Sequence, residues 1–248
     1  MNLLIDIGNT AIKFGVYRNN KIEVFLINNT KDVIESKNPL DFDLPANIID
    51  DIERVFISSV VPEINIKFQN YFEKINKEVN FISPLDESGV KINIDYKEEL
   101  GTDLLCDLAG ANDLFKAPIL IVDLGTATKF LFIDKNGVFS TCAIVPGLEL
   151  TLQTLNKNTS LLPKIELGDI KPLLENHNTK DVLMASAYYS HIDMINGMVN
   201  RYKKEVGYPF KIVMSGGNAK LIIDKLDFDY ETIEFLCLYG IKIIADRK

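Results

Sequence analysis

Asp6-Ile7-Gly8-Asn9-Thr10 stands near the start of the chain, and its pattern recurs as Asp123-Leu124-Gly125-Thr126-Ala127. Each copy follows a short apolar run that is typical of a buried strand. Each copy also leads through a β-rich segment to a turn pair thirteen residues after the Asp, Asn19-Asn20 in the first and Asn136-Gly137 in the second. This shared spacing predicts a β-meander that occurs twice in the chain.

Both copies have the chemistry of a phosphate-binding turn. A Gly two residues after an Asp lets the backbone turn tightly, so that peptide N–H groups and Asn or Thr side chains can reach an anion. The Asp supplies a hard oxygen for Mg²⁺, usually through water. A single Asp-x-Gly-Asn also occurs commonly in β-hairpin turns that bind no ligand. Two copies at matching offsets favour two phosphate turns over that alternative.

The composition is that of a soluble globular protein, with 248 residues, 47% apolar and 25% charged. A formal charge of -8 leaves no general basic face. Broad electrostatic binding to nucleic acid or to an anionic membrane is therefore not expected. An anionic substrate has to be bound locally, by a metal ion and by backbone donors.

The cysteines and histidines are too few for several kinds of site. Cys106, Cys142 and Cys237 are odd in number and lack metal-ligand spacing, which predicts reduced core residues of a cytoplasmic protein. His177 and His191 are the only histidines, so a His-based metal site or triad is not expected. We expect no signal peptide and no membrane span.

Strands that alternate with helices place the chain in the α/β class. The two meanders are expected over residues 3–27 and 119–145, with further strands over 55–61, 79–83 and 211–214. Helices are expected over residues 64–77, 104–115, 148–155, 181–205 and 232–246. The expected boundary precedes the second copy and gives halves 1–113 and 114–248. Two such halves would place a nucleotide in the cleft between them.

Six motifs in this order and spacing resemble those of type III pantothenate kinases over nearly the whole chain. They are Asp6 to Thr10, Ser58-Ser59-Val60-Val61-Pro62, Gly101-Thr102-Asp103, Asp123 to Thr128, Pro146-Gly147 and Ser215-Gly216-Gly217. The resemblance implies the fold of actin, sugar kinases and Hsp70, with duplicated ribonuclease H-like halves. It also implies a homodimer that phosphorylates pantothenate with ATP, the first step of coenzyme A synthesis.

The resemblance further implies a role for individual residues. ATP and its phosphates would be bound by Asp6, Gly8, Asn9, Thr10, Lys13, Gly125, Thr126, Thr128, Ser215, Gly216 and Gly217, with Asp6 and Asp123 nearest the Mg²⁺. Pantothenate would be bound by Tyr96, Gly101, Thr102, Asp103, Pro146 and Gly147, and by Thr179 of the partner subunit. Without the family, residues 215–217 also fit a tight strand-to-helix turn, and Pro146-Gly147 and Thr179 fit ordinary loop positions.

Asp103 is the candidate general base. A primary hydroxyl is a poor nucleophile at neutral pH, and a nearby carboxylate can accept its proton as the phosphoryl group moves. Asp is also a preferred N-cap, and Asp103 precedes the helix expected from Leu104. The two roles do not exclude each other.

The chain departs from the family pattern at the expected pantothenate site. Leu104 replaces an Arg, which removes a planar cation suited to a carboxylate. Ahead of Gly101 the family has Asn-Pro and, further back, a Tyr, whereas here Tyr96 is followed by Lys97-Glu98 and the spacing is shorter.

A second departure concerns a monovalent cation, K⁺ or NH₄⁺. Leu131 replaces an Asp that the family associates with this cation, and Lys129 stands where the family commonly has a small residue. An ammonium at Lys129 could supply part of the missing charge, or Lys129 could be a solvated strand residue. The hypothesis is that dependence on a monovalent cation is weak or absent.

Three functions fit these features. The first is a pantothenate kinase, and the second is a kinase of the same fold that acts on another small alcohol, as Leu104 would allow. The third is a nucleotide-binding regulatory protein without catalysis. The retained Asp103 and the lack of a basic nucleic-acid face speak against the third.

Overall fold

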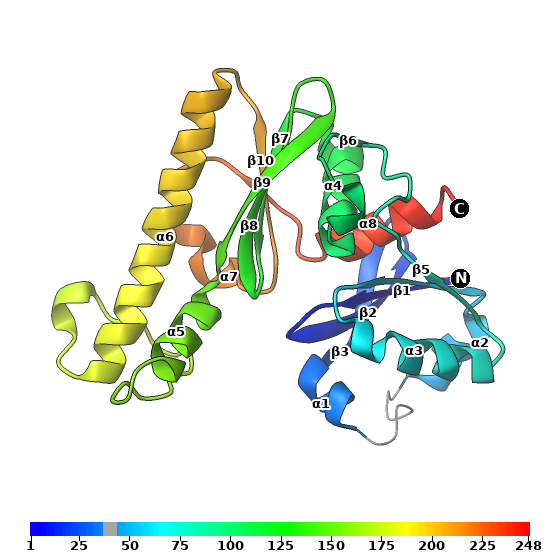
Figure 1. Cartoon of the computed structure of the whole chain (residues 1–248), viewed down its shortest axis with the longest axis horizontal. Helices are drawn as coiled ribbons and strands as arrows, with labels where there is room; N and C mark the ends of the chain where they lie inside the picture. The colour runs from blue at the N-terminus through cyan, green and yellow to red at the C-terminus, as the bar shows by residue number, and fades with distance from the viewer. Residues whose placement is uncertain (37–43) are drawn as a thin grey trace. The chain divides into compact units, whose positions relative to one another are not determined.

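The computed structural model describes residues 1–36 and 44–248 (Figure 1). The chain forms two compact units, each with its own β-sheet and hydrophobic cluster. Unit 1 comprises Met1–Ala117, Ile133–Thr141 and Phe235–Lys248, and unit 2 comprises Pro118–Phe132 and Cys142–Glu234. Division of the chain into halves 1–113 and 114–248 follows the sequence repeat and stays a prediction.

The sheet of unit 1 contains the first meander. Its strands are β1 (Asn2–Ile7), β2 (Ala11–Arg18), β3 (Lys21–Asn29), β4 (Arg54–Ser59) and β5 (Glu78–Phe81), in the order β3-β2-β1-β4-β5. β1 to β3 are antiparallel, whereas β4 pairs in parallel with β1 and with β5. Asn19 and Asn20 connect β2 to β3 with φ of 53° and 61°, a conformation that Asn tolerates better than most residues.

The helices of unit 1 bury the sheet's apolar residues. They are α1 (Thr30–Glu35), α2 (Ala46–Asp51), α3 (Pro62–Lys74), α4 (Thr102–Phe115) and α8 (Leu236–Ala245), with the 3₁₀ helix η1 at Lys97–Glu99. α3 begins with a Pro at its first position, where the missing N–H costs nothing. Its Phe68 stacks on Phe14 of β2, with ring centroids 6.1 Å apart.

Two glycines let α4 and α8 cross at very short range. A Cβ at Gly240 would overlap the backbone of Cys106, and one at Gly110 would lie 3.0 Å from the Leu236 carbonyl oxygen. At this crossing the side chains of Cys106 and Cys237 are hydrogen bonded; this bond and burial raise the pKa of the Cys237 thiol well above its ordinary value. All three cysteines are free thiols, as predicted, although Cys142 and Cys237 are only half-buried residues.

Unit 2 carries the second meander. The six strands of its sheet are β11 (Glu231–Thr232), β10 (Lys211–Ser215), β7 (Ile119–Leu124), β8 (Ala127–Ile133), β9 (Val138–Pro146) and β6 (Lys91–Ile92), in that order. The short β6 pairs with the start of β9, and both of these segments belong to unit 1. The order β9-β8-β7-β10-β11 repeats the order β3-β2-β1-β4-β5, which confirms the predicted duplication of the meander.

The long helix α6 (Figure 1) contributes several residues to the apolar cluster of unit 2. The helical segments of this unit are α5 (Leu148–Lys157), η2 (Leu173–Glu175), α6 (Thr179–Val206), α7 (Ala219–Ile222) and η3 (Ile223–Lys225). The Asn178 side chain caps α6, and Gly207 ends it in the left-handed conformation. Ile192, Ile195 and Val199 of α6 share one buried cluster with residues of β7.

Most predicted elements are confirmed to within a few residues. The last helix is an exception: it was expected from residue 232 but begins at Leu236, because Glu231–Thr232 form β11. The short elements α1, α2, β6 and α7 were not predicted, since segments of two to six residues carry too little periodicity. Among the described residues, no helix is long and apolar enough to cross a membrane.

Candidate active site

The first phosphate turn connects β1 to β2. Asp6 lies opposite Lys13 in the β1–β2 register, and the Lys13 ammonium donates to Asp6 Oδ2 at 2.9 Å. Asp6 is only 6% exposed, whereas Asn9 and Thr10 at the tip of the turn are exposed. The turn therefore presents backbone and polar side chains to solvent above a partly buried ion pair.

Thr30, at the start of α1, holds this turn in place. Its backbone N–H donates to the Thr10 carbonyl at 3.0 Å, and its hydroxyl donates to the Gly8 carbonyl at 2.7 Å. Gly8 in turn donates to the carbonyl of Ala11 at 3.0 Å. Thr30 is 1% exposed, so these bonds are shielded from competing water.

The second turn repeats the same ion pair. Lys129 on β8 donates to Asp123 Oδ2 at 2.9 Å, and the two side chains are 16% and 14% exposed. The interpretation of Lys129 as a solvated strand residue is therefore wrong. Each phosphate turn has an Asp that pairs with a Lys from the strand that follows.

Two other predicted loops pack against the second turn. The Gly147 N–H donates to the Thr126 carbonyl at 3.0 Å, and a Cβ at Gly147 would overlap the turn's backbone. Gly216, at φ 94°, lies against Leu124, where a Cβ would come within 2.5 Å of backbone atoms. Within unit 2 the structure thus brings Pro146-Gly147 and Ser215-Gly216-Gly217 to the second turn.

Thr128 is buried, unlike Asn9, Thr10 and Thr126, which are exposed. It is 1% exposed, and its hydroxyl is 3.0 Å from Nε2 of His191 on α6. His191 is also buried, and burial lowers the pKa of its imidazole. The Thr128 side chain thus lies in the core of unit 2, beneath the turn.

Asp103 lies in the first turn of α4, with Gly101 as the N-cap residue. The interpretation of Asp103 as the N-cap is wrong, because the helix begins at Thr102. Oδ1 of Asp103 accepts a hydrogen bond from the Leu104 N–H at 2.9 Å. A Cβ at Gly101 would lie 2.5 Å from this oxygen, so the glycine leaves room for the carboxylate.

Thr102 ties the start of α4 to the strand beside the first turn. Its buried hydroxyl accepts from Ser58 Oγ at 3.0 Å and donates to the Ser59 carbonyl at 3.2 Å. Ser58 lies opposite Asp6 in the parallel β1–β4 register. Within unit 1 the helix that carries Asp103 is therefore anchored next to the first phosphate turn.

The remaining predicted residues differ in exposure. Tyr96 is 62% exposed, and Thr179 is exposed at the first position of α6. Leu104 is 7% exposed and packs in the core, while Leu131 is fully buried on β8. Neither leucine side chain can supply a cation or an oxygen ligand.

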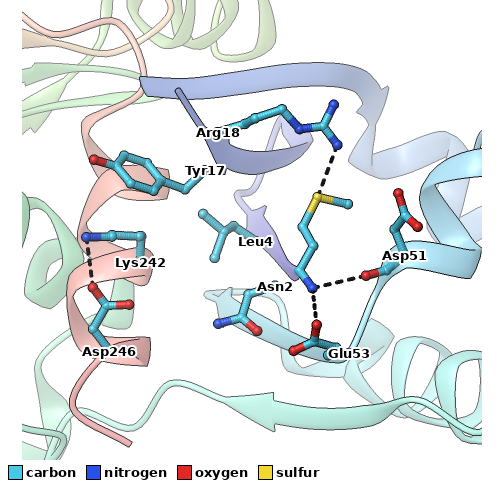
Figure 2. A pocket seen from close by; sticks show the side chains of 9 residues that line it. Asn2, Leu4, Tyr17, Arg18, Asp51, Glu53, Lys242 and Asp246 are labelled. Atoms are coloured by element: carbon cyan, nitrogen blue, oxygen red, sulfur yellow. Dashed lines mark hydrogen bonds and ion pairs between the residues drawn. The ribbon is translucent and has the colours of Figure 1, made fainter. Parts of the chain in front are cut away.

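A groove of about 520 Å³ lies at the other end of β1 (Figure 2). Its lining consists of Met1, Asn2, Leu4, Tyr17, Arg18, Asp51, Glu53, Lys242 and Asp246. Figure 2 shows its charges largely paired, with the terminal amino group on Glu53 at 2.8 Å and Lys242 on Asp246 at 2.8 Å. None of the predicted site residues lines this groove, so we place the candidate active site at the turns.

Residues 2–201 match the model of a protein family described as type III pantothenate kinase. The chain belongs to this family. A type III pantothenate kinase from Acholeplasma laidlawii is 33% identical over 97% of this chain and 96% of its own length. One from Bifidobacterium animalis subsp. lactis is 31% identical over 92% of this chain and 94% of its own length. The expectation of a pantothenate kinase, a transferase of coenzyme A biosynthesis, is confirmed at the level of the family.

Solved structures support the predicted fold. A Baf family transcriptional activator from Campylobacter jejuni has a TM-score of 0.54 at 19% identity, covering 99% of this chain and 97% of its own. Component A of (R)-2-hydroxyglutaryl-CoA dehydratase from Acidaminococcus fermentans has a TM-score of 0.51 at 16% identity, covering 98% and 95%. The actin-like ATPase fold of this kinase is thereby confirmed. A kinase of this fold is expected to bind ATP with a divalent metal.

Several residues that shape the site were missed in the sequence. Thr30 and Asn218 bond to the turns, and His191 bonds to Thr128 at the start of β8, although none of the three belongs to a quoted motif. Ser58 belongs to a quoted motif but was given no role, and it bonds to Thr102 of α4. Asn218, for example, donates from its N–H to the Leu124 carbonyl at 3.0 Å. For the ion pairs the sequence does contain a signal, because Lys13 follows Asp6 and Lys129 follows Asp123 at similar spacing.

Proposed function

We propose that this chain transfers the terminal phosphoryl group of ATP to the primary hydroxyl of pantothenate, with Asp103 as general base. The observation that carries the proposal is the anchoring of Thr102 to Ser58, next to Asp6 in the sheet. This contact supports the proposal, because it anchors the helix that carries Asp103 to the strand next to the proposed phosphate turn. A hydroxyl held there could lose its proton to Asp103 while it attacks the phosphorus.

The turns would bind the phosphates of ATP. Backbone N–H groups and side chains at Gly8, Asn9 and Thr10, and at Gly125 and Thr126, would donate to phosphate oxygens. Ser215-Gly216-Gly217 would lie against the adenosine, where missing side chains allow close approach. Lys13 and Lys129 would keep the turns from repelling phosphate, because each neutralises the adjacent Asp.

Asp6 and Asp123 would hold the Mg²⁺. One or two carboxylates suffice for this metal in phosphoryl-transfer sites, since phosphates and waters complete its coordination. Among the described residues, no group of three or more His, Cys, Asp or Glu is placed to hold a metal alone, which fits an ion that arrives with the nucleotide. When bound, Mg²⁺ would neutralise charge on the phosphates.

Buried Leu104 favours a second candidate, a kinase for another small alcohol. Its apolar side chain offers no partner to the pantothenate carboxylate. An assay of ADP formation with pantothenate and with a panel of alcohols, with and without a carboxylate, separates the two. Turnover with pantothenate well above the background ATPase rate supports the first candidate. Turnover with carboxylate-free alcohols alone would contradict it.

Lys129 should make the enzyme insensitive to monovalent cations. We propose that its ammonium supplies the charge that K⁺ or NH₄⁺ would bring, because it contacts Asp123 at 2.9 Å. Titration with KCl against choline chloride at constant ionic strength should change kcat/KM by less than about twofold. The Lys129→Met variant keeps a long unbranched side chain but removes the ammonium that pairs with Asp123. Its kcat/KM for ATP should fall about tenfold. Steep activation of the unmodified enzyme by K⁺ would refute this role.

We also propose a homodimer that pairs through the segment around the start of α6. Leu161, Leu174 and Val182 are 92%, 95% and 44% exposed, and an interface that covered these apolar side chains would stabilise a dimer. In the same region Thr179 would reach the partner's pantothenate site.

Sedimentation should give a particle of twice the 28.0 kDa chain mass. The double variant Leu161→Glu/Leu174→Glu should sediment as a monomer, because the introduced carboxylates would have to be buried in the interface. Leu85→Glu is the matched control, since Leu85 is 69% exposed but belongs to unit 1. A monomeric unmodified chain at micromolar concentration would contradict the proposal.

A further inference from the structure

A polar pair interrupts the apolar cluster of unit 2. Thr128 on β8 and His191 on α6 are 1% and 7% exposed, and the Thr128 hydroxyl is 3.0 Å from Nε2 of His191. The neighbouring residues on either strand or helix, such as Phe130, Ile192 and Ile195, are apolar members of the cluster. A buried hydroxyl or imidazole is costly unless it is hydrogen bonded, so each of the two groups depends on the other.

The pair lies directly beneath the second phosphate turn. Thr128 is the first residue after the turn whose side chain is fully buried, and the next residue, Lys129, makes the ion pair with Asp123. Successive side chains of a strand point to opposite faces. Thr128 can therefore meet His191 only when Lys129 is directed to the opposite face.

A shift of β8 by one residue would break both contacts. It would carry Thr128 to the outer face and remove the partner of His191, because the side-chain period of a strand is two. An apolar residue at position 128 would pack against α6 without this directional requirement. The hydrogen bond thus fixes the orientation of β8 at the point where it leaves the turn.

We propose that His191 is a positioning residue for ATP binding, which acts through Thr128 to hold the second phosphate turn in its binding conformation. The proposal rests on the proposed function, in which Gly125 and Thr126 bind phosphate. It also reassigns Thr128, whose side chain would orient the turn from below and would not contact the nucleotide. Hydrogen bonds from Gly147 to Thr126 and from Asn218 to Leu124 also hold this turn, so His191 would act alongside them.

A double-mutant cycle with two further variants tests the proposal. Thr128→Val and His191→Leu each leave one buried polar group without its partner, whereas the double variant Thr128→Val/His191→Leu removes both groups. His191→Gln retains a side-chain amide that can reach the position of Nε2. Ser190→Ala is the matched control on α6, because the Ser190 hydroxyl donates to the Ala187 carbonyl of its own helix at 3.2 Å.

Two quantities are measured for each variant: the Kd for ATP by calorimetry with Mg²⁺ present, and the midpoint of urea unfolding. Both single variants should weaken ATP binding on the order of tenfold, as expected when a turn loses its preorganised conformation. The double variant should have an unfolding midpoint close to that of the unmodified chain, because no buried polar group is left without its partner. Its ATP affinity should stay as weak as that of the single variants. His191→Gln and Ser190→Ala should bind ATP within about twofold of the unmodified chain.

The outcomes separate positioning from stability. If the double variant recovers ATP affinity together with its unfolding midpoint, or if no variant changes the Kd, the proposal is overturned. The Kd does not depend on the acceptor alcohol, so a chain that binds ATP but does not phosphorylate pantothenate would still test His191 while the proposed reaction fails. A chain that binds no ATP would overturn both.

Discussion

Replacing Asp103 by Asn is expected to lower kcat by about 10²–10⁴-fold, the usual contribution of a general base. The substitution preserves the size of the side chain and an oxygen that can accept the Leu104 N–H, a bond of 2.9 Å in the structure. It removes only the capacity to accept the proton of the attacking hydroxyl. The Kd for ATP should stay within about twofold, because the phosphate turns are not altered.

The control for this variant is Glu99→Gln. Glu99 is an exposed carboxylate of η1, close to α4 in sequence but without a predicted contact to substrate. Its kcat should match that of the unmodified enzyme. A near-normal kcat for Asp103→Asn would show that Asp103 is not the base, and a loss of ATP binding would show that the substitution disturbs the nucleotide site.

The largest effect on stability is expected for Gly240→Ala. A Cβ at this position would overlap the Cys106 carbonyl group and lie only 2.7 Å from its Cα. These are backbone atoms, which cannot rotate away, so α4 and α8 would have to separate. We expect a loss of about 3 kcal/mol in the free energy of unfolding, the upper end for overpacking in a core. Urea denaturation monitored by circular dichroism measures this loss.

Gly197→Ala is the matched control in a helix. Gly197 lies within α6, and a Cβ there would meet no atom within 4 Å. The substitution should raise the free energy of unfolding by roughly 0.5–1 kcal/mol, because Ala has the higher helix propensity. Equal unfolding midpoints for Gly240→Ala and the unmodified chain would mean that the close crossing of α4 and α8 is not required.

The crossing also bears on the active site. α8 packs against α4, whose first turn carries Asp103, and Tyr239 on α8 donates to Asp113 Oδ2 on α4 at 2.8 Å. Burial, together with this bond, raises the pKa of Tyr239 to about 12, so the hydroxyl stays a donor at neutral pH. Gly240→Ala should therefore lower activity because it disturbs the packing of α4, which carries Asp103. It should not change the contacts to ATP directly.

The meanders were predictable because their signals are local. The Asp-x-Gly turn and the turn pair thirteen residues later recur in sequence, and the strands between them match the structure. The position of Asp103 at the start of α4 could also be predicted from the Gly-x-Asp motif. These features depend on neighbouring residues, where backbone geometry restricts the choices.

Contacts that need strand register or long-range packing could not be predicted. The ion pairs of Lys13 and Lys129 depend on which residues lie opposite each Asp in the sheet. This strand register could not be predicted from the sequence. The bond between Thr128 and His191 joins residues 63 positions apart. Thr128 was therefore predicted to contact phosphate, because the sequence shows its motif but does not show that His191 is its partner.

Transfer of label from [γ-³²P]ATP to pantothenate tests the central claim most directly. The unmodified chain with Mg²⁺ and pantothenate should produce labelled phosphopantothenate, identified by chromatography against the authentic compound, and Asp103→Asn should produce almost none. Label that appears only as inorganic phosphate or on another alcohol, with none on pantothenate, would contradict the account.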